Sequence, residues 1–254
     1  MNLLISLRSE MLKTRRTASF YLTLILAGVI PLVLFLNVCF DGIEPENKNN
    51  VFNALFREAF TMTGFLIFPM FIVLLCTLLP QIEYKNNAWK QVLASPQTKG
   101  NIFIAKFLNI HLLLLIFLVA NHLFMFLAAL GIHLAQPSLQ LFSKPLDISA
   151  VLTRGLNTYI ALLAISAMQF WLGLRFKNFI VPMAVGLSGW FIGALMVMEF
   201  HSSYAVYFPY SFHVFSVFPK DKSQLPSILW TSVWYTVVLL VLGFLDFRRK
   251  RVSA

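Results

Sequence analysis

Charge is scarce in this chain of 254 residues. Asp, Glu, Lys and Arg together make up 12% of it, whereas soluble domains carry about 25%. So little charge cannot cover a soluble globule of this size, and a soluble enzyme is therefore excluded. The hydrophobic content of 59% and the presence of only two cysteines also exclude a disordered chain and a disulfide scaffold. The class that remains is a polytopic membrane protein.

Sequence signatures of catalysis and metal binding are missing as well. The chain has no Gly-Lys dipeptide, so it lacks the loop that holds the phosphates of ATP in many ATPases. It has neither HExxH nor CxxC, the ordinary zinc signatures. We therefore expect a non-enzymatic chain with no catalytic residue, no metal and no cofactor of its own.

Runs without charged residues indicate six spanning helices, because a helix needs about 20 apolar residues to cross the hydrocarbon core. The predicted fold is all-α, with residues 1–254 forming one transmembrane domain. The spans are expected at about 17–40, 59–82, 107–135, 151–174, 178–198 and 226–245.

A seventh charge-free run, Phe200–Pro219, has a different character. It holds eight aromatic residues together with Pro209, His201 and His213. Aromatic-rich segments broken by proline suit the membrane interface or a re-entrant segment better than a free span. We expect an outer re-entrant loop before the sixth span.

The basic residues are distributed unequally across the six predicted spans. The side that carries both termini and the segment between spans two and three has a net charge of +11, and the other side has −1. The positive-inside rule makes the basic side cytoplasmic, so we expect a multi-pass protein of the cell membrane with both termini inside. No folded basic domain is present that would suit nucleic acid. Instead, the terminal basic residues are expected to anchor the chain to membrane lipids: Lys13, Arg15, Arg16, Arg248, Arg249, Lys250 and Arg251.

The segment before the first span has a two-faced helical pattern. One face carries Leu3, Leu4, Leu7 and Met11, and the opposite face carries Ser6, Ser9, Glu10 and Lys13. This pattern favours an interfacial helix over residues 1–16, lying along the inner leaflet. The alternative is a simple positive flank of the first span.

A second short helix is indicated in the segment 84–96. Trp89, Val92 and Leu93 recur at the spacing of one helical face, and Pro96 disfavours helix at the preceding residue. A cytoplasmic helix with one aromatic residue in a basic surround could dock a soluble partner. It could equally lie on the membrane surface with Trp89 as its anchor. The residues alone leave both alternatives open.

Three histidines, His111, His122 and His133, recur every 11 residues and so share one helical face. Successive ones are about 16 Å apart, too far to share a metal. They form either a polar stripe facing a substrate or bundle-facing residues bonded to the backbone or to Asn109 and Asn121. The second arrangement is favoured because polar groups in membrane helices usually bond to neighbouring helices.

One short motif suggests an enzyme. Gly186-Leu-Ser188-Gly189 matches the GxSG of rhomboid intramembrane proteases, but the last span has no histidine to serve as general base. We therefore interpret the motif as a packing face. The acids of the chain also lie at helix edges, so ion-coupled transport has no obvious residue to use.

The pattern as a whole resembles the ABC transporter permeases of the type-2 exporter family, and looks most similar to the small six-helix permeases of lantibiotic and bacitracin self-protection systems. The long loop before the sixth span matches the outer re-entrant element of that family. The residues that carry the resemblance are Glu10, Lys13 and Arg16 before the first span, Glu83 at the end of the second, and then Lys85, Trp89, Lys90, Leu93, Pro96 and Lys106.

The resemblance implies a specific machine. The segment 84–96 would be a coupling helix that inserts into a separate ATPase subunit, which would carry the ATP and Mg²⁺. Two permease chains, identical or homologous, would pair above two ATPases and export a hydrophobic or amphipathic substrate, with antimicrobial peptides and lipid-like compounds as candidates. The implied docking residues are Glu83, Lys85, Asn87, Trp89, Lys90 and Leu93. The alternatives are a membrane sensor or scaffold that docks a cytoplasmic partner, and an intramembrane serine protease.

Overall fold

The computed structural model describes residues 3–15, 17–42, 50–85, 88–218 and 223–249 of the chain. Within these ranges every regular element is helical. The all-α class predicted from the sequence is thus confirmed.

Six helices are long and apolar enough to cross a membrane, which is the number expected from the charge-free runs. They are α2 (Ala18–Asp41), the continuous stretch Val51–Lys85, α6 (Lys99–Ala135), α7 (Ile148–Arg175), α8 (Ile180–Met198) and α10 (Leu225–Arg249). The second of them consists of α3 (Val51–Met62), a π-helical turn η2 (Thr63–Ile67) and α4 (Phe68–Lys85).

Two of these helices begin earlier than the predicted spans. Helix α3 starts at Val51 rather than near residue 59, and α6 starts at Lys99 rather than near 107. Charged side chains limit burial in lipid, but they do not end a helix, and Arg57 and Glu58 simply lie exposed on α3. The end of α6 at Ala135 is where the sequence placed it.

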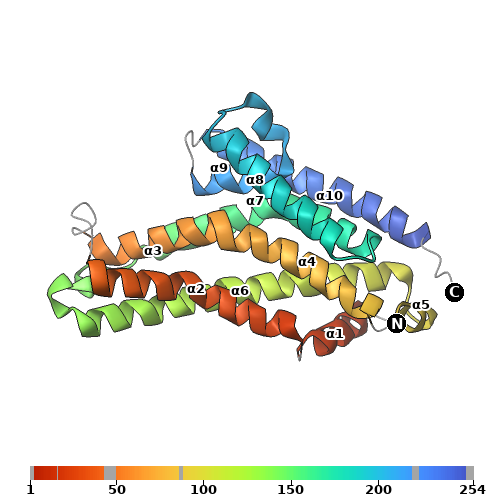
Figure 1. Ribbon diagram of the computed structural model, residues 1–254, viewed down its shortest axis with the longest axis horizontal. Helices are drawn as coiled ribbons and strands as arrows, with labels where there is room; N and C mark the ends of the chain where they lie inside the picture. Colours follow the sequence, from red (N-terminus) through yellow and green to blue (C-terminus); the bar gives the residue numbers. More distant parts are fainter. Residues whose placement is uncertain (1–2, 16, 43–49, 86–87, 219–222, 250–254) are drawn as a thin grey trace.

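The helices pack around an aromatic core. Phe117 of α6 contacts two rings of α4, with centroids 5.3 Å from Phe68 and 4.9 Å from Phe71. Phe170 of α7 packs against Phe103 of α6 at 5.0 Å. As Figure 1 shows, α2, α3–α4, α6 and α7 run beside one another, while α8 and α10 cover one side of this group.

The aromatic run before the last helix forms three short helices instead of a long one: η5 (Ser203–Tyr207), η6 (Pro209–Ser211) and α9 (Phe212–Val217). They pack against α7 and α8. Two glycines of α8 make this close packing possible. An added Cβ at Gly189 would lie 2.9 Å from the Tyr210 ring, and one at Gly193 would lie 2.5 Å from the Tyr210 carbonyl oxygen. Insertion of this loop into the membrane stays a prediction.

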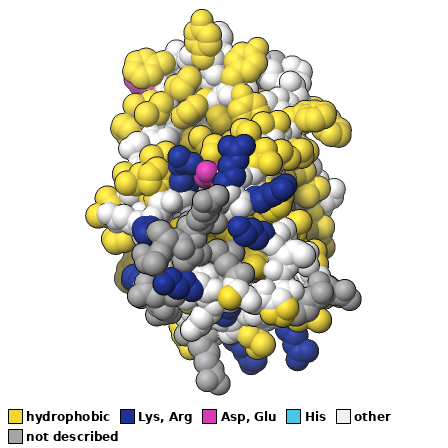
Figure 2. All heavy atoms as spheres, turned by 90° about the vertical axis from the view of Figure 1, so that its right-hand side faces the viewer, with side chains coloured by type: hydrophobic (Ala, Val, Ile, Leu, Met, Phe, Trp, Pro, Cys, Tyr) yellow, Lys and Arg dark blue, Asp and Glu magenta, His cyan; other side chains and the backbone are white. Residues whose placement is uncertain are grey.

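The two ends of the bundle differ in composition. At one end, called the α5 end here, lie α1 (Leu3–Thr14), α5 (Trp89–Ala94), the start of α6 and the end of α10 (Figure 1). Figure 2 faces this end and shows lysine and arginine side chains gathered on it. At the other end, the α3 end, α2 and α6 finish and α3 and α7 begin. Helices η3 (Pro137–Leu139) and η4 (Leu141–Ser143) follow α6 there.

Candidate coupling site

Helix α1 turns its polar face toward the bundle. Ser6 and Thr14 are buried, whereas the side chains of Leu4 and Leu12 are 75% and 61% exposed. The Asn109 side-chain amide of α6 donates a hydrogen bond to the Thr14 hydroxyl at 2.8 Å. The two faces expected from the sequence therefore exist, and the polar one is held by α6.

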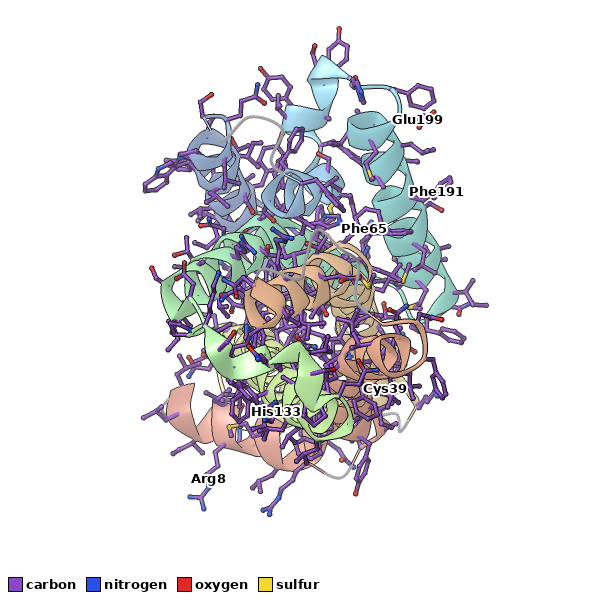
Figure 3. The ribbon with its side chains drawn as sticks, turned by 90° about the vertical axis from the view of Figure 1, so that its left-hand side faces the viewer. Arg8, Cys39, Phe65, His133, Phe191 and Glu199 are labelled. Carbon is purple, nitrogen blue, oxygen red and sulfur yellow. The ribbon has the colours of Figure 1, made fainter. Side chains whose placement is uncertain are left out.

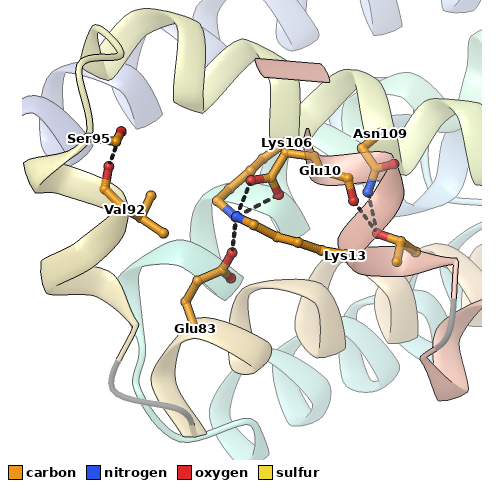
Figure 4. A network of polar contacts seen from close by, with 8 residues as sticks. Glu10, Lys13, Glu83, Val92, Ser95, Lys106 and Asn109 are labelled. Carbon is orange, nitrogen blue, oxygen red and sulfur yellow. Dashed lines mark hydrogen bonds and ion pairs between the residues drawn. The ribbon is translucent and has the colours of Figure 1, made fainter. Parts of the chain in front are cut away.

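A network of four charged side chains joins α1, α4 and α6 (Figure 4). The Glu10 carboxylate lies 2.7 Å from the Lys13 ammonium and 2.8 Å from the Lys106 ammonium. Lys106 also pairs with Glu83, the side chains being 6% and 4% exposed. Lys13 completes the network at 3.4 Å from the same Glu83 oxygen.

The electrostatics of α1 follow from this network. Burial alone would raise the pKa of the Glu10 carboxyl, but the Lys106 and Lys13 ammonium groups outweigh it and lower that pKa. Burial alone would lower the pKa of the Lys13 ammonium, but Glu10 and Glu83 raise it. Glu10 and Lys13 are therefore charged near neutral pH, and the opposite charges of the network compensate one another's desolvation.

Helix α5 is attached to this network through Trp89. The Lys106 ammonium lies 5.5 Å from the centroid of the Trp89 ring, a cation–π distance. On its other sides the ring packs against Tyr84 at 5.4 Å and Phe247 of α10 at 5.9 Å. Trp89 is only 6% exposed, so one buried side chain connects α5 to α4, α6 and α10.

This position bears on the expected role of Trp89 as an aromatic anchor for a partner or for the membrane surface. In the chain by itself its ring packs in the chain's own core, so an anchoring role stays a prediction. Glu83, also a predicted docking residue, is buried in the ion network. Both side chains are enclosed by other residues of the chain, so neither is available for direct contact with a partner in this arrangement.

The basic members of the predicted docking set are accessible. Lys85 at the end of α4 and Lys90 on α5 are both exposed, as is the neighbouring Gln91. Asn87 lies outside the described residues, and the side chain of Leu93 is also not described. The exposed surface of this segment therefore carries two positive charges, beside the exposed Ala94 and Pro96.

The predicted lipid anchors differ in their surroundings. The Lys13 ammonium pairs with the Glu10 and Glu83 carboxylates while its side chain is 37% exposed, and its contact with lipid phosphates stays a prediction. Arg15 is exposed after α1, and Arg248 and Arg249 are exposed on the last turn of α10. Arg16, Lys250 and Arg251 lie outside the described residues. For the exposed three, lipid contact stays a prediction.

Two important members of the network, Glu10 and Lys106, were not in the predicted docking set. They did stand among the residues that carry the family resemblance. A further signal was available, because Lys106 is the last charge before the long apolar stretch of α6. A lysine there needs a carboxylate partner.

The three histidines of α6 do not form one stripe with one role. His111 lies 2.7 Å from the Tyr159 hydroxyl and 3.2 Å from the Ser166 hydroxyl. His122 bonds to the Leu118 carbonyl oxygen of its own helix at 2.7 Å. Asn109 and Asn121 bond elsewhere, to Thr14 and to the backbone of Ala27. Among the described residues, no cluster of His, Cys, Asp or Glu could hold a metal ion.

The GxSG motif is a packing face, as interpreted from the sequence. Gly186 and Gly189 face the bundle, and Ser188 is exposed on the outer side of α8. At Gly186 an added Cβ would lie 2.4 Å from Val73 of α4. Small residues at this spacing allow helices to approach closely.

Comparison with known families agrees with this architecture. Residues 6–193 match the family described as ABC-2 family transporter protein. The match covers most of α1, the ion network, α5, the first four long helices and most of the fifth. No curated protein matches the sequence. The chain belongs to the ABC-2 transporter family, and it is a multi-pass membrane protein of the permease type.

Proposed function

We propose that this chain is the membrane subunit of an ATP-driven exporter and that a separate ATPase docks at the α5 end. Family membership supports the permease role. The single observation that carries the docking proposal is the attachment of α5 through Trp89 to the buried ion network and to Phe247. An ATPase that displaced α5 would move α4, α6 and α10 with it.

The contact surface follows from exposure and charge. Lys85 and Lys90 project from the segment that the core side chains hold in place. Rim charges of this kind mainly set the association rate and the choice of partner. The partner groove would therefore be acidic, and Trp89 would serve as the internal attachment of α5 rather than as the contact itself.

The mechanism is a two-state switch biased by ATP. Helix α5 has only six residues, so by itself it is too short to be stable in water and depends on Trp89 for its position. The buried charges of Glu83 and Lys106 resist separation, because an unpaired charge would be costly there. Closure of the ATPases would therefore shift the attached helices together and open the pathway to the other side.

The assembly would contain two permease chains and two ATPases with their ATP and Mg²⁺. Helix α10 leaves large apolar side chains exposed, including Trp230 and Trp234, which can meet lipid or a second permease chain. The α5 end would be cytoplasmic, since the lysine and arginine side chains gather there (Figure 2). The cargo would be hydrophobic or amphipathic, with antimicrobial peptides and lipid-like compounds as the classes to test.

Co-expression with an ABC ATPase encoded beside this chain tests the proposal. The isolated chain in lipid nanodiscs should not hydrolyse ATP. The copurified complex should hydrolyse ATP, and cells that co-express the two chains should retain less of an amphipathic dye. A complex whose ATPase carries a substituted Walker A lysine is the control. Robust hydrolysis by the isolated chain would contradict the proposal, and a stable complex without export would indicate a sensor or scaffold.

A further inference from the structure

A cavity of about 510 Å³ opens at the α3 end between α3, α6 and the start of α7. Figure 3 looks onto this end, where Cys39 and His133 mark the last turns of α2 and α6. The volume lies within the range of small-molecule sites. The cavity is far from the ion network, which lies at the α5 end (Figure 1).

Three cationic side chains line this cavity: Arg57 of α3, Arg154 of α7 and Lys144 of the loop before α7. Arg57 and Arg154 each stand six residues after the first residue of their helix. Both helices begin at the α3 end, so both arginines lie about 9 Å along their helices from it. They are therefore placed at a similar depth in the cavity.

This concentration of positive charge runs against its surroundings. By the charge distribution of the sequence, this side of the protein has a net charge of −1, yet the cavity is lined by three cations and one acid, Asp147. The Asp147 carboxylate already accepts a hydrogen bond from the Ala150 amide at 2.9 Å, capping α7. The cavity is thus a local positive site on a face that is otherwise not basic.

The rim of the cavity is held in place by hydrogen bonds. The Asn53 side chain donates to the Pro145 carbonyl oxygen at 2.9 Å and accepts from the Asp147 amide at 2.8 Å. These two bonds fix the loop that carries Lys144 against α3. A preformed rim reduces the ordering cost of binding a ligand.

Apolar side chains also line the cavity, among them the buried Phe56 and Met125 and the partly buried Phe60. His122 is also part of the lining and bonds with one ring nitrogen to its own helix. A ligand that fills this cavity therefore meets both positive charge and hydrocarbon.

We propose that this cavity binds a phosphate-bearing anionic amphiphile, with the phosphate at Arg57 and Arg154 and the apolar portion along Phe60 and Met125. The planar guanidinium group matches phosphate oxygens two at a time. The ligand class follows from the lining alone, so the proposal does not depend on ATP coupling. Its failure would leave the proposed function untouched.

Binding to the purified full-length chain in detergent tests the proposal. The probes are a water-soluble short-chain phosphatidic acid, the matching phosphatidylcholine and inorganic phosphate, each followed by calorimetry at low and high salt. We expect saturable binding of the phosphatidic acid, weakened by salt and at least tenfold tighter than that of the other two probes. Equal binding of inorganic phosphate would overturn the amphiphile assignment, and equal binding of phosphatidylcholine would overturn the charge assignment.

Matched variants locate the site. Arg57→Gln and Arg154→Gln should each weaken binding of the phosphatidic acid about tenfold, the usual effect of losing one charge-assisted hydrogen bond. Arg57→Lys should retain part of the affinity, because lysine keeps the positive charge but lacks the planar guanidinium group that binds two phosphate oxygens at once. Arg8→Gln, which removes an exposed arginine of α1 that points away from the bundle (Figure 3), should bind like the unaltered chain. Unchanged affinity in the Arg57→Gln/Arg154→Gln double variant, with an unaltered melting temperature, would overturn the proposal.

Discussion

The ammonium of Lys106 and the carboxylate of Glu83 form a buried ion pair between the start of α6 and the end of α4. The two residues are 23 positions apart, and the segment between them contains α5. The pair therefore closes a loop around the very helix that we propose as the docking element. In the proposed mechanism this pair would transmit a displacement of α5 to the spans.

Removing the lysine of this pair should destabilise the protein. Lys106→Met leaves Lys13 as the counter-charge of Glu10 and Glu83 in the described network. Breaking a buried ion pair by removing one partner costs about 3–5 kcal/mol of folding free energy, and we expect a loss of that order. Thermal unfolding in detergent measures the change. Lys90→Met removes an exposed lysine nearby and should shift stability by no more than about 0.5 kcal/mol. Equal melting temperatures for the two variants would contradict the role of the network.

The network also predicts how stability depends on pH. The folded pKa of Glu10 lies below its usual value of 4.5, so its contribution is complete above that pH and is lost as the pH falls through the lower folded value. The folded pKa of Lys13 lies above its usual value of 10.5, so its contribution is present below that pH and is lost as the pH rises further. Lys13 is more than one third exposed, which makes its share the smaller one.

Melting temperatures measured across the acid range check this prediction. In the Glu10→Gln variant the melting temperature should fall less as the pH is lowered through the acid range (the acid limb of the curve), because this substitution removes a carboxyl group that titrates there. Glu58→Gln alters an exposed carboxyl of α3 and should leave the limb as it is. If the Glu10→Gln curve keeps its full acid limb, another group is responsible for it.

The glycines of α8 provide a test of the loop before α10. Gly193→Ala would place a Cβ 2.5 Å from the Tyr210 carbonyl oxygen, and such overpacking costs about 1–3 kcal/mol. Gly155→Ala on α7 meets nothing within 4 Å and should be neutral or stabilise by up to about 1 kcal/mol, since alanine favours helix. Melting temperatures that fall equally in both variants would show that η6 does not pack on α8 as described.

The fold was predictable to a large extent, because the bilayer demands apolar helices of a minimum length. The sequence located six of them, but it missed the start of α3, since Arg57 and Glu58 interrupt the charge-free run without interrupting the helix. It also indicated a helix at Trp89. Periodicity alone cannot tell whether an aromatic face meets a partner, lipid or the chain's own core.

The candidate sites were less predictable. Lys106 meets Glu83 because α4 and α6 lie side by side there, and it meets Glu10 because α1 folds back against α6. No spacing in the sequence encodes these tertiary contacts. The basic cavity depends on Arg57 and Arg154 standing at equal depth on two helices that are far apart in the sequence. Lys106 and Arg154 did leave a trace in the sequence, because each is the last charged residue before a long apolar stretch.

The topology can be tested with cysteine labelling in intact cells. In a Cys39→Ser background, Ser203→Cys should react with a membrane-impermeant maleimide, because Ser203 is exposed and lies on the predicted outer side. Lys85→Cys should react only after the membrane is opened. Ser216 is unsuitable for the same purpose, since it is buried and bonded to Thr158 at 2.9 Å. Labelling of both sites in intact cells would contradict the six-span topology.

The most direct measurement of the central claim is partner binding by a charge-reversed α5 segment. Lys85→Glu/Lys90→Glu reverses two exposed charges without touching the Trp89 core, and Arg8→Glu changes one exposed charge of α1 at the same end. We predict that the double variant keeps its melting temperature but binds the ATPase at least tenfold more weakly, while Arg8→Glu binds it normally. Full ATPase binding and export by the Lys85→Glu/Lys90→Glu variant would show that α5 is not the docking element.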